Sequence, residues 1–205
     1  MYLSQLILNP RNRAVQRDLA RPHDLHKTIM AAFPDNLDKA QERVLYRLDQ
    51  HAQTQQVALL VQSQEQPDWS TLPASYLLDN PGTKAFNLQL QPGQRLAFRL
   101  RANPTKKIKD ERNPKNGKRI GLYKMEEQIN WLQRKAAAHG FAIHTAMPTQ
   151  QQRVADRRED LKFFSVQFDG TLRVTDADKL LTAIQAGIGS GKAFGFGLLS
   201  LAPVR

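Results

Sequence analysis

Apolar side chains recur at every second residue in two short segments of the first ninety residues, and a short, mostly apolar run that Asn9-Pro10 ends reads as a buried strand before them. A period of two predicts β-strands, because successive side chains of a strand point to opposite faces of its sheet. The predicted strands cover residues 3–8, 44–48 and 57–61. After Pro22, which suits the first position of a helix, apolar residues follow a helical spacing and predict a helix over 22–33.

A weaker helix over residues 69–78 and a strand over 86–90 complete this half of the chain. The predicted order, β-α-β-β-α-β, is that of a ferredoxin-like fold. A Gln-Pro-Gly turn at residues 91–93 favours a domain boundary. We therefore predict a first domain over residues 1–90 and a second domain over 94–205.

A similar pattern begins again after this turn. Alternation over residues 96–100 predicts a strand, and an apolar stripe over 124–139 predicts a long helix. Apolar residues alternate with other residues over 164–174, and the dipeptide Asp169-Gly170 within this segment is typical of tight hairpins. We therefore expect two strands joined by a turn there.

One more helix and one more strand follow. Asp176 can cap a helix that ends at Gly187, and a strand is expected near residues 198–201. These elements predict a second ferredoxin-like unit, so the fold class is α+β with two tandem ferredoxin-like domains. Three phenylalanines at or beside the strand predicted before Asp169-Gly170 lack the sequence pattern of aromatic residues that stack on RNA bases, so we expect them in the core. They are Phe163, Phe164 and Phe168.

Basic residues dominate the charge of the chain. Its 205 residues carry 30 Lys and Arg against 19 Asp and Glu, a net charge of +11, which favours nucleic acid or anionic lipid as a partner. Charge alone does not choose between these partners. Without cysteine there is no disulfide, no thiolate metal site and no cysteine nucleophile. Neither a membrane-spanning window nor a signal-peptide pattern is seen, so we expect a soluble, cytoplasmic protein with no membrane partner.

Much of the positive charge lies in residues 99–119, which hold nine Lys or Arg against two acidic residues. Asn-Pro and Asn-Gly dipeptides there predict a long loop or hairpin that can enter the groove of an RNA stem. A solvated loop is the alternative. With a smaller basic patch that follows, the expected RNA-binding residues are Arg99, Arg101, Lys106, Lys107, Lys109, Arg112, Lys115, Lys118, Arg119, Arg157 and Arg158.

Residues 187–197 form a glycine-rich segment with the spacing G-h-G-x5-G-h-G, where h is apolar. It is not a P-loop, because it follows a helix and because Ala186 and Ala193 occupy two required positions. Glycine lets a backbone approach phosphates closely, so Gly189 and Lys192 are candidates to bind an anion. A loop that only packs between a helix and a strand is the alternative.

Four further segments, together with the glycine spacing, resemble the CasE-type endoribonucleases of the repeat-associated RNA-binding superfamily. They are residues 3–26, 92–104, 128–134 and 195–203. The resemblance implies tandem ferredoxin-like (RRM-like) domains and metal-independent cleavage at the 3′ base of the CRISPR repeat stem-loop. It also implies that the guide RNA stays bound within Cascade, beside other Cascade subunits and especially the backbone subunit, and that no cofactor or metal takes part.

His26 matches the catalytic histidine of that family. Histidine titrates near neutral pH and suits proton transfer while a 2′-hydroxyl attacks the adjacent phosphate. Relatives often carry tyrosine where this chain has His23, so the two histidines divide the acid and base roles or His23 only orients RNA. Lys27 and Arg21 are nearby cations that can meet the scissile phosphate, whereas Ala31 takes the place of a lysine that assists in some relatives. A non-catalytic or weakly catalytic RNA-holding subunit is the alternative.

Overall fold

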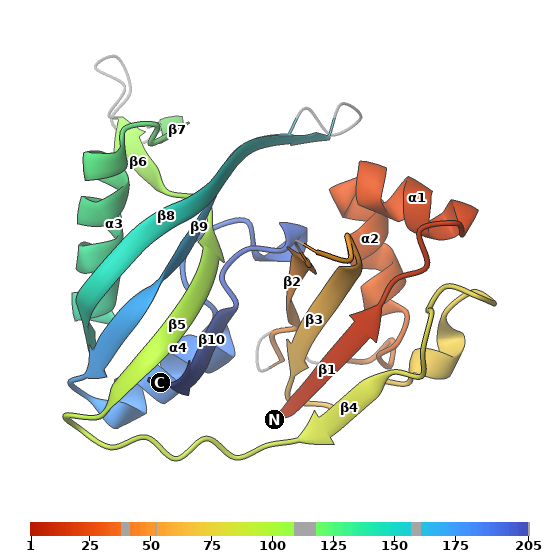
Figure 1. Ribbon diagram of the computed structural model, residues 1–205, viewed down its shortest axis with the longest axis horizontal. Coiled ribbons are helices and arrows are strands. Elements are labelled where there is room, and N and C mark those ends of the chain that lie inside the picture. Colours follow the sequence, from red (N-terminus) through yellow and green to blue (C-terminus); the bar gives the residue numbers. More distant parts are fainter. Residues whose placement is uncertain (38–41, 52, 109–117, 157–160, 205) are drawn as a thin grey trace.

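Two four-stranded antiparallel sheets stand side by side in the computed structural model (Figure 1). Each sheet has its own apolar core, formed with the helices that pack against it. The structure describes residues 1–37, 42–51, 53–108, 118–156 and 161–204.

The first sheet has the strand order β2-β3-β1-β4. Its strands are β1 (Tyr2–Ile7), β2 (Leu45–Gln50), β3 (Val57–Ser63) and β4 (Gly82–Ala85). Helices α1 (Arg13–Ala20) and α2 (Pro22–Met30) share an apolar core with β1 and β3. This is the order of a ferredoxin-like unit in which the second helix is reduced to one turn, η1 (Trp69–Thr71).

The chain between residues 69 and 90 differs from the prediction. The helix expected over 69–78 is wrong beyond η1, because Pro73 lacks an amide hydrogen and Ser75 has a φ of 58°. The strand expected over 86–90 is also wrong, since β4 is the strand that pairs with β1. The apolar alternation of 86–90 has another cause. Its two leucines pack against the second core as the chain crosses to the second sheet.

The second sheet repeats this topology in the order β10-β5-β9-β8. Its strands are β5 (Arg95–Ala102), β8 (Phe141–Asp156), β9 (Leu161–Val174) and β10 (Leu199–Pro203). Helices α3 (Met125–Ala138) and α4 (Ala177–Ala186) pack against the face that carries the even-numbered apolar residues of β5 and β9. The expected α+β fold with tandem ferredoxin-like domains is confirmed.

The hairpin expected at Asp169-Gly170 is wrong. β9 runs through both residues and pairs along its whole length with β8. No part of β8 was predicted, and its second half is mostly polar. A Cβ atom at Gly170 would lie 2.0 Å from the carbonyl oxygen of Thr145, beside a shift of register between Ile143 and Thr145. The glycine therefore permits a close backbone approach at an irregular pairing and does not mark a turn.

Helix α1 was not predicted from the basic stretch that precedes Pro22. The side chain of Asn12 caps it by accepting from the amide hydrogens of Ala14 and Val15. Only Val15 and Asp18 are buried. So narrow a buried stripe leaves no visible helical period in the sequence.

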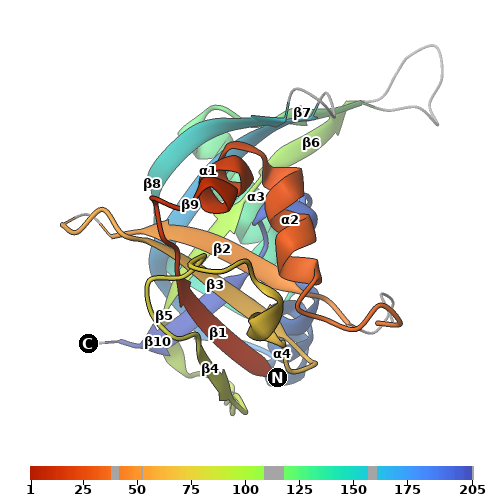
Figure 2. The ribbon, with the colours of Figure 1, turned by 90° about the vertical axis from the view of Figure 1, so that its right-hand side faces the viewer.

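A two-stranded hairpin projects from the second half of the chain (Figure 2). Its strands are β6 (Thr105–Ile108) and β7 (Lys118–Gly121), and Lys107 pairs directly with Arg119. This confirms the expected hairpin in the basic segment. Residues 109–117, between the two strands, lie outside the described residues.

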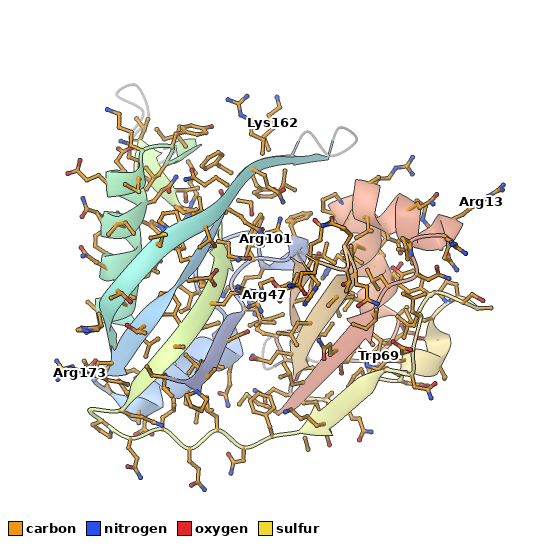
Figure 3. The ribbon with its side chains drawn as sticks, viewed as in Figure 1. Arg13, Arg47, Trp69, Arg101, Lys162 and Arg173 are labelled. Atoms are coloured by element: carbon orange, nitrogen blue, oxygen red, sulfur yellow. The ribbon has the colours of Figure 1, made fainter. Side chains whose placement is uncertain are left out.

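Polar side chains join the two sheets. Nη1 of Arg47 donates to Oγ of Ser200 at 2.8 Å, and Nε2 of Gln62 donates to the carbonyl oxygen of Ile184 at 2.7 Å. Arg47 is 3% exposed and lies between the sheets (Figure 3). The two halves are therefore held together by buried donors and acceptors, while the domain boundary at residues 91–93 stays a prediction.

Candidate functional site

Helix α2 places His26 where the two halves of the chain meet. Leu25 and Ile29 are buried in the first core and fix the orientation of the helix. The His26 ring stacks on Tyr46 of β2, with centroids 6.4 Å apart and 19° between the ring planes. The Tyr46 hydroxyl donates to the carbonyl oxygen of Ala193 at 2.8 Å, and burial raises the pKa of this hydroxyl. Tyr46 thus links the histidine to the glycine-rich loop.

His26 lines a cavity of about 280 Å³ with a residue from the opposite half, Lys192. Lys192 lies in the short turn η3 (Lys192–Phe194) of the glycine-rich loop. Burial, then the charges of Arg43 and Lys135, lower the pKa of Lys192. We call this space the histidine cavity, and it is lined by His26, Met30, Leu37, Glu42, Arg43, Val44, Lys192 and Ala193. It combines a proton-transfer group with clustered cations, an arrangement that suits a phosphate.

Arg43 and Glu42 were not identified from the sequence. Arg43 is exposed, whereas Glu42 is 7% exposed and its carboxylate accepts from the amide hydrogen of Gln64 at 2.7 Å. Burial raises the pKa of Glu42. A charged pair just before a strand has no distinctive spacing, so only the fold shows that it lies beside His26.

The other residues expected near His26 do not line the histidine cavity in the described part of the chain. His23 is half-buried and lies three residues earlier on α2, one helical turn away. Lys27 is exposed. Arg21 precedes the first residue of α2, and its Nη1 lies 3.5 Å from a carboxylate oxygen of Asp24. The structure therefore brings His26 together with Lys192, and His23 and Lys27 stay candidates on the flank of the helix.

The glycine-rich loop packs tightly between the sheets. Gly189 and Gly195 have φ values of +92° and +80°. A Cβ atom would lie 3.2 Å from the Trp131 ring at Gly189 and 3.1 Å from the Tyr46 ring at Gly195. Packing therefore explains both glycines. Contact of Gly189 with RNA stays a prediction, and the cation of the loop, Lys192, is the group aimed at the histidine cavity.

The same loop lines two further cavities. Phe194 and Gly195 line one of about 270 Å³, which also holds Arg101 and Arg153. We call it the arginine cavity. Ser190 lines another, of about 590 Å³, at the root of the β6–β7 hairpin, which we call the aromatic cavity. The glycine-rich loop is thus a wall common to three neighbouring cavities.

Arg101 and Arg99 differ in how far they are free to bind RNA. Nε of Arg101 donates to Oγ of Ser165 at 2.8 Å and Nη1 donates to the carbonyl oxygen of Leu48 at 3.3 Å, while burial lowers its pKa. Its remaining donors suit an anion in the arginine cavity. Nε of Arg99 lies 2.6 Å from a carboxylate oxygen of Asp169, a hydrogen bond that raises the pKa of Arg99. A phosphate at Arg99 must compete with this carboxylate.

The hairpin carries the next group of expected RNA-binding residues. Lys107 and Arg119 are exposed and opposite one another, whereas Nζ of Lys106 lies 2.7 Å from a Glu127 carboxylate oxygen. Lys118 belongs to β7 by its backbone. The remaining residues lie outside the described part of the chain and stay predictions. They are Lys109, Arg112, Lys115, Arg157 and Arg158.

A buried carboxylate fastens α2 to its surroundings. The Asp18 side chain is 0% exposed. One of its oxygens accepts from the Thr28 hydroxyl at 2.7 Å and from the Tyr76 hydroxyl at 2.8 Å, and the other accepts from Arg17. Thr28 is two residues from His26, so this network holds the helix that presents the histidine. An aspartate in a basic stretch gave no sign of this role.

The described residues were also compared with the patterns of metal sites and of membrane-spanning helices. In residues 1–37, 42–51, 53–108, 118–156 and 161–204, no three His, Asp or Glu side chains cluster as metal ligands do. Among the helices that the structure describes, none has the length and apolar character needed to cross a lipid bilayer.

Comparisons with known proteins agree with these features. A family model described as CRISPR associated protein matches residues 1–203. The CRISPR-associated endoribonuclease Cse3 of Thermus thermophilus is 38% identical, over 99% of this chain and 100% of its own length. The CRISPR system Cascade subunit CasE of Escherichia coli K12 is 37% identical, with 100% of both chains covered.

A solved structure extends the likeness to three dimensions. The structure of Thermus thermophilus Cse3 bound to an RNA representing a pre-cleavage complex has a TM-score of 0.89. It is 38% identical in sequence, and 98% of each chain is covered. The chain therefore belongs to the CRISPR-associated protein family and, within it, to the CasE (Cse3) type of Cascade endoribonuclease.

Proposed function

We propose that this chain binds the stem-loop of CRISPR repeat RNA, cuts it at the 3′ base of the stem and keeps the product bound within Cascade. The observation that carries the proposal is the histidine cavity, where His26 of one half meets Lys192 of the other and Arg43 beside them. Metal-independent RNA cleavage needs groups that move protons and cations that stabilise the charged phosphorane. This cavity offers both kinds of group.

In the proposed reaction the 2′-oxygen attacks the neighbouring phosphorus and the bond to the 5′-oxygen breaks. One group takes the proton of the 2′-hydroxyl and another protonates the leaving 5′-oxygen. We assign one transfer to His26 and the other to His23, one helical turn away. Lys192 and Arg43 stabilise the negative charge that develops on the phosphate oxygens. The products are a 2′,3′-cyclic phosphate and a 5′-hydroxyl.

The names of the relatives support the choice of substrate and partners. Two of them are a CRISPR-associated endoribonuclease and a Cascade subunit, and solved relatives include one bound to RNA and one within Cascade bound to DNA. We therefore expect CRISPR repeat RNA as the ligand of this chain and other Cascade subunits, especially the backbone subunit, as its partners. The proposal includes a cytoplasmic location.

A second candidate function is an RNA-holding subunit that cuts slowly or not at all. His23 favours it, because relatives often carry tyrosine at this place. Single-turnover cleavage compared with equilibrium binding separates the two functions. Tight binding without measurable cleavage supports the holding subunit.

Cleavage of the repeat RNA in EDTA tests the proposal. We expect one cut at the base of the stem, with a cyclic phosphate on the 5′ fragment, at the same rate with and without the chelator. RNA with a single 2′-deoxynucleotide at the cut site is the matched control and should stay intact. Cleavage only after addition of a divalent metal, or cleavage of the deoxy substrate, contradicts the mechanism.

The hairpin lysines should determine how strongly binding depends on salt. Replacing Lys106 and Lys107 with alanine should weaken stem-loop binding and reduce the slope of log K against log salt by roughly 0.7–0.9 for each phosphate that the variant no longer binds. Lys84→Ala with Arg173→Ala removes two exposed cations far from the hairpin and should leave the slope unchanged. Lys84 belongs to β4 (Figure 1), and Arg173 lies near the end of β9 (Figure 3). An unchanged slope in the hairpin variant means that the segment is only a solvated loop.

A further inference from the structure

The aromatic cavity has the walls of a site for a flat ligand. Tyr123 and Phe164 form one side, with ring centroids 4.7 Å apart and 60° between the ring planes, and Phe163 lies nearby. Tyr123 is 59% exposed although it is a large aromatic residue. The volume of about 590 Å³ falls in the range of small-ligand pockets, roughly 300–1,000 Å³. The expectation of core packing is confirmed for Phe168, which is fully buried, and for Phe164, which packs against the second core with only part of its surface exposed. Phe163 is also half-buried and packs on Phe194 and Phe196.

Cations surround this apolar space. Arg119, Arg153 and Lys162 all line the aromatic cavity and all are exposed. Lys162 lies at the end of the second sheet nearest the hairpin (Figure 3). Three positive charges around aromatic walls complement a ligand that joins a flat apolar ring to a phosphate chain. An aliphatic or aromatic side chain of another protein would gain little from them.

Polar residues complete the lining of the cavity. Asn103 is 7% exposed, and its side-chain oxygen accepts from the amide hydrogen of Phe164 at 3.3 Å. Thr105 and Ser190 also line the cavity. Apolar walls with a few fixed donors and acceptors are the usual composition of a site that binds a heteroaromatic ring. Single-stranded RNA bases are bound in this way, by stacking and by hydrogen bonds to their edges.

The aromatic cavity lies next to the histidine cavity. Ser190 lines the first and Lys192 lines the second. Because Ser190 and Lys192 are two residues apart in the chain, their α-carbons are at most about 7.6 Å apart. One RNA strand can therefore place a phosphate beside Lys192 and, next to it, a base in the aromatic cavity.

We propose that the aromatic cavity binds one unpaired base of the repeat RNA, stacked on Tyr123, beside the phosphate that is cut. This inference rests on the proposed function and adds a site for a single nucleotide to it. The base that enters the cavity leaves the stack of the RNA, which turns its sugar and phosphate toward His26. The site then contributes both to affinity and to the choice of the bond that is broken.

The test combines base removal with substitution of Tyr123. Repeat RNAs, each with one abasic site at an unpaired position next to the stem, are titrated against wild-type protein, Tyr123→Ala and Tyr123→Phe. One abasic position should weaken binding to wild-type protein and to Tyr123→Phe by about 5- to 150-fold, the range measured for one base stacked on an aromatic side chain. Tyr123→Ala should bind intact RNA more weakly by a similar factor. Removal of the base at the sensitive position should then weaken binding to this variant only slightly further.

Met147→Ala is the matched control, because Met147 is an exposed apolar residue of β8, 67% exposed, that does not line the aromatic cavity. It should bind every RNA as wild type does. Equal losses in wild type and Tyr123→Ala at all abasic positions, or no loss at any position, overturn the base site. The base site is also overturned if Tyr123→Ala and Met147→Ala weaken binding of intact RNA by the same small factor.

The two proposals fail in different ways. Wild-type protein that cuts intact repeat RNA in EDTA but is insensitive to every abasic position keeps the proposed function and loses the base site. Wild-type protein that binds the RNA with the expected dependence on Tyr123 yet never cuts it keeps the base site and loses the nuclease. A protein partner in the cavity would make Tyr123→Ala defective in assembly with Cascade while RNA binding stays at the wild-type level, which also overturns the base site.

Discussion

His26→Ala should lower the single-turnover rate of repeat cleavage by about 10²–10⁴-fold, the contribution typical of one proton-transfer group. Binding of the stem-loop should change little, because the cations of the hairpin and the loop provide most of the attraction to phosphate. His51→Ala is a matched control, since His51 is exposed in the turn between β2 and β3 of the same sheet. A wild-type rate for His26→Ala would mean that α2 does not carry the active site.

His23 distinguishes between two forms of this mechanism. If both histidines transfer protons, His23→Ala should also slow cleavage and the wild-type rate should follow a bell-shaped dependence on pH. His23→Tyr should then restore much of the rate and remove one limb of that profile. A silent His23→Ala would instead leave Lys192 or Arg43, the cations that share the cavity of His26, as the next residues to replace.

Asp18→Ala should reduce the free energy of unfolding by about 3 kcal/mol, because the Thr28 and Tyr76 hydroxyls lose a shared acceptor in a buried place. Denaturant titration measures this change. Cleavage should slow as well, even under conditions where the variant is fully folded, because Thr28 no longer ties α2 to α1. Stem-loop affinity should stay close to wild type, which separates misplacement of His26 from loss of RNA binding.

Asp24→Ala is the control for this effect. Asp24 is on α2 and pairs with Arg21 at 3.5 Å, but both side chains are partly exposed. Surface pairs of this kind contribute about 1 kcal/mol or less. Equal destabilisation by Asp24→Ala and Asp18→Ala would contradict the view that the buried network around Asp18 anchors the helix.

Much of the fold could be predicted from local patterns, and the errors have physical causes. The strand around Phe98 alternates strictly because one of its faces is buried. The strand around Tyr46 has buried residues on both faces, and it was still recognised because its apolar residues alternate with other side chains in the sequence. The hairpin predicted at Gly170 was wrong because, in a sequence, a glycine needed for close backbone approach looks the same as a glycine needed for a turn. Residues 86–90 misled because an extended connection that packs on a core alternates as a strand does.

The site was predictable only in part. His26 was found through family resemblance and Lys192 through the spacing of the glycines around it, and the structure places them in one cavity. Arg43 and Asp18 were not found, because their importance arises from neighbours that are distant in sequence. Tyr123 was missed for the same reason. Its ring forms a site only where β7, β8 and β9 come together.

The polar contacts between the sheets limit how this protein can be recombined. Its two halves repeat one topology, yet Arg47 depends on Ser200, and Gln62 depends on a carbonyl group of α4. Arg47 keeps its partner Asp49 within its own half, so a chimera whose other half lacks matching acceptors would leave one nitrogen of Arg47 and the amide of Gln62 buried without a partner. Each such group costs about 1–3 kcal/mol. The halves therefore repeat one topology but are not exchangeable modules. A chimera that folds well must take the donors and the acceptors of these contacts from the same parent.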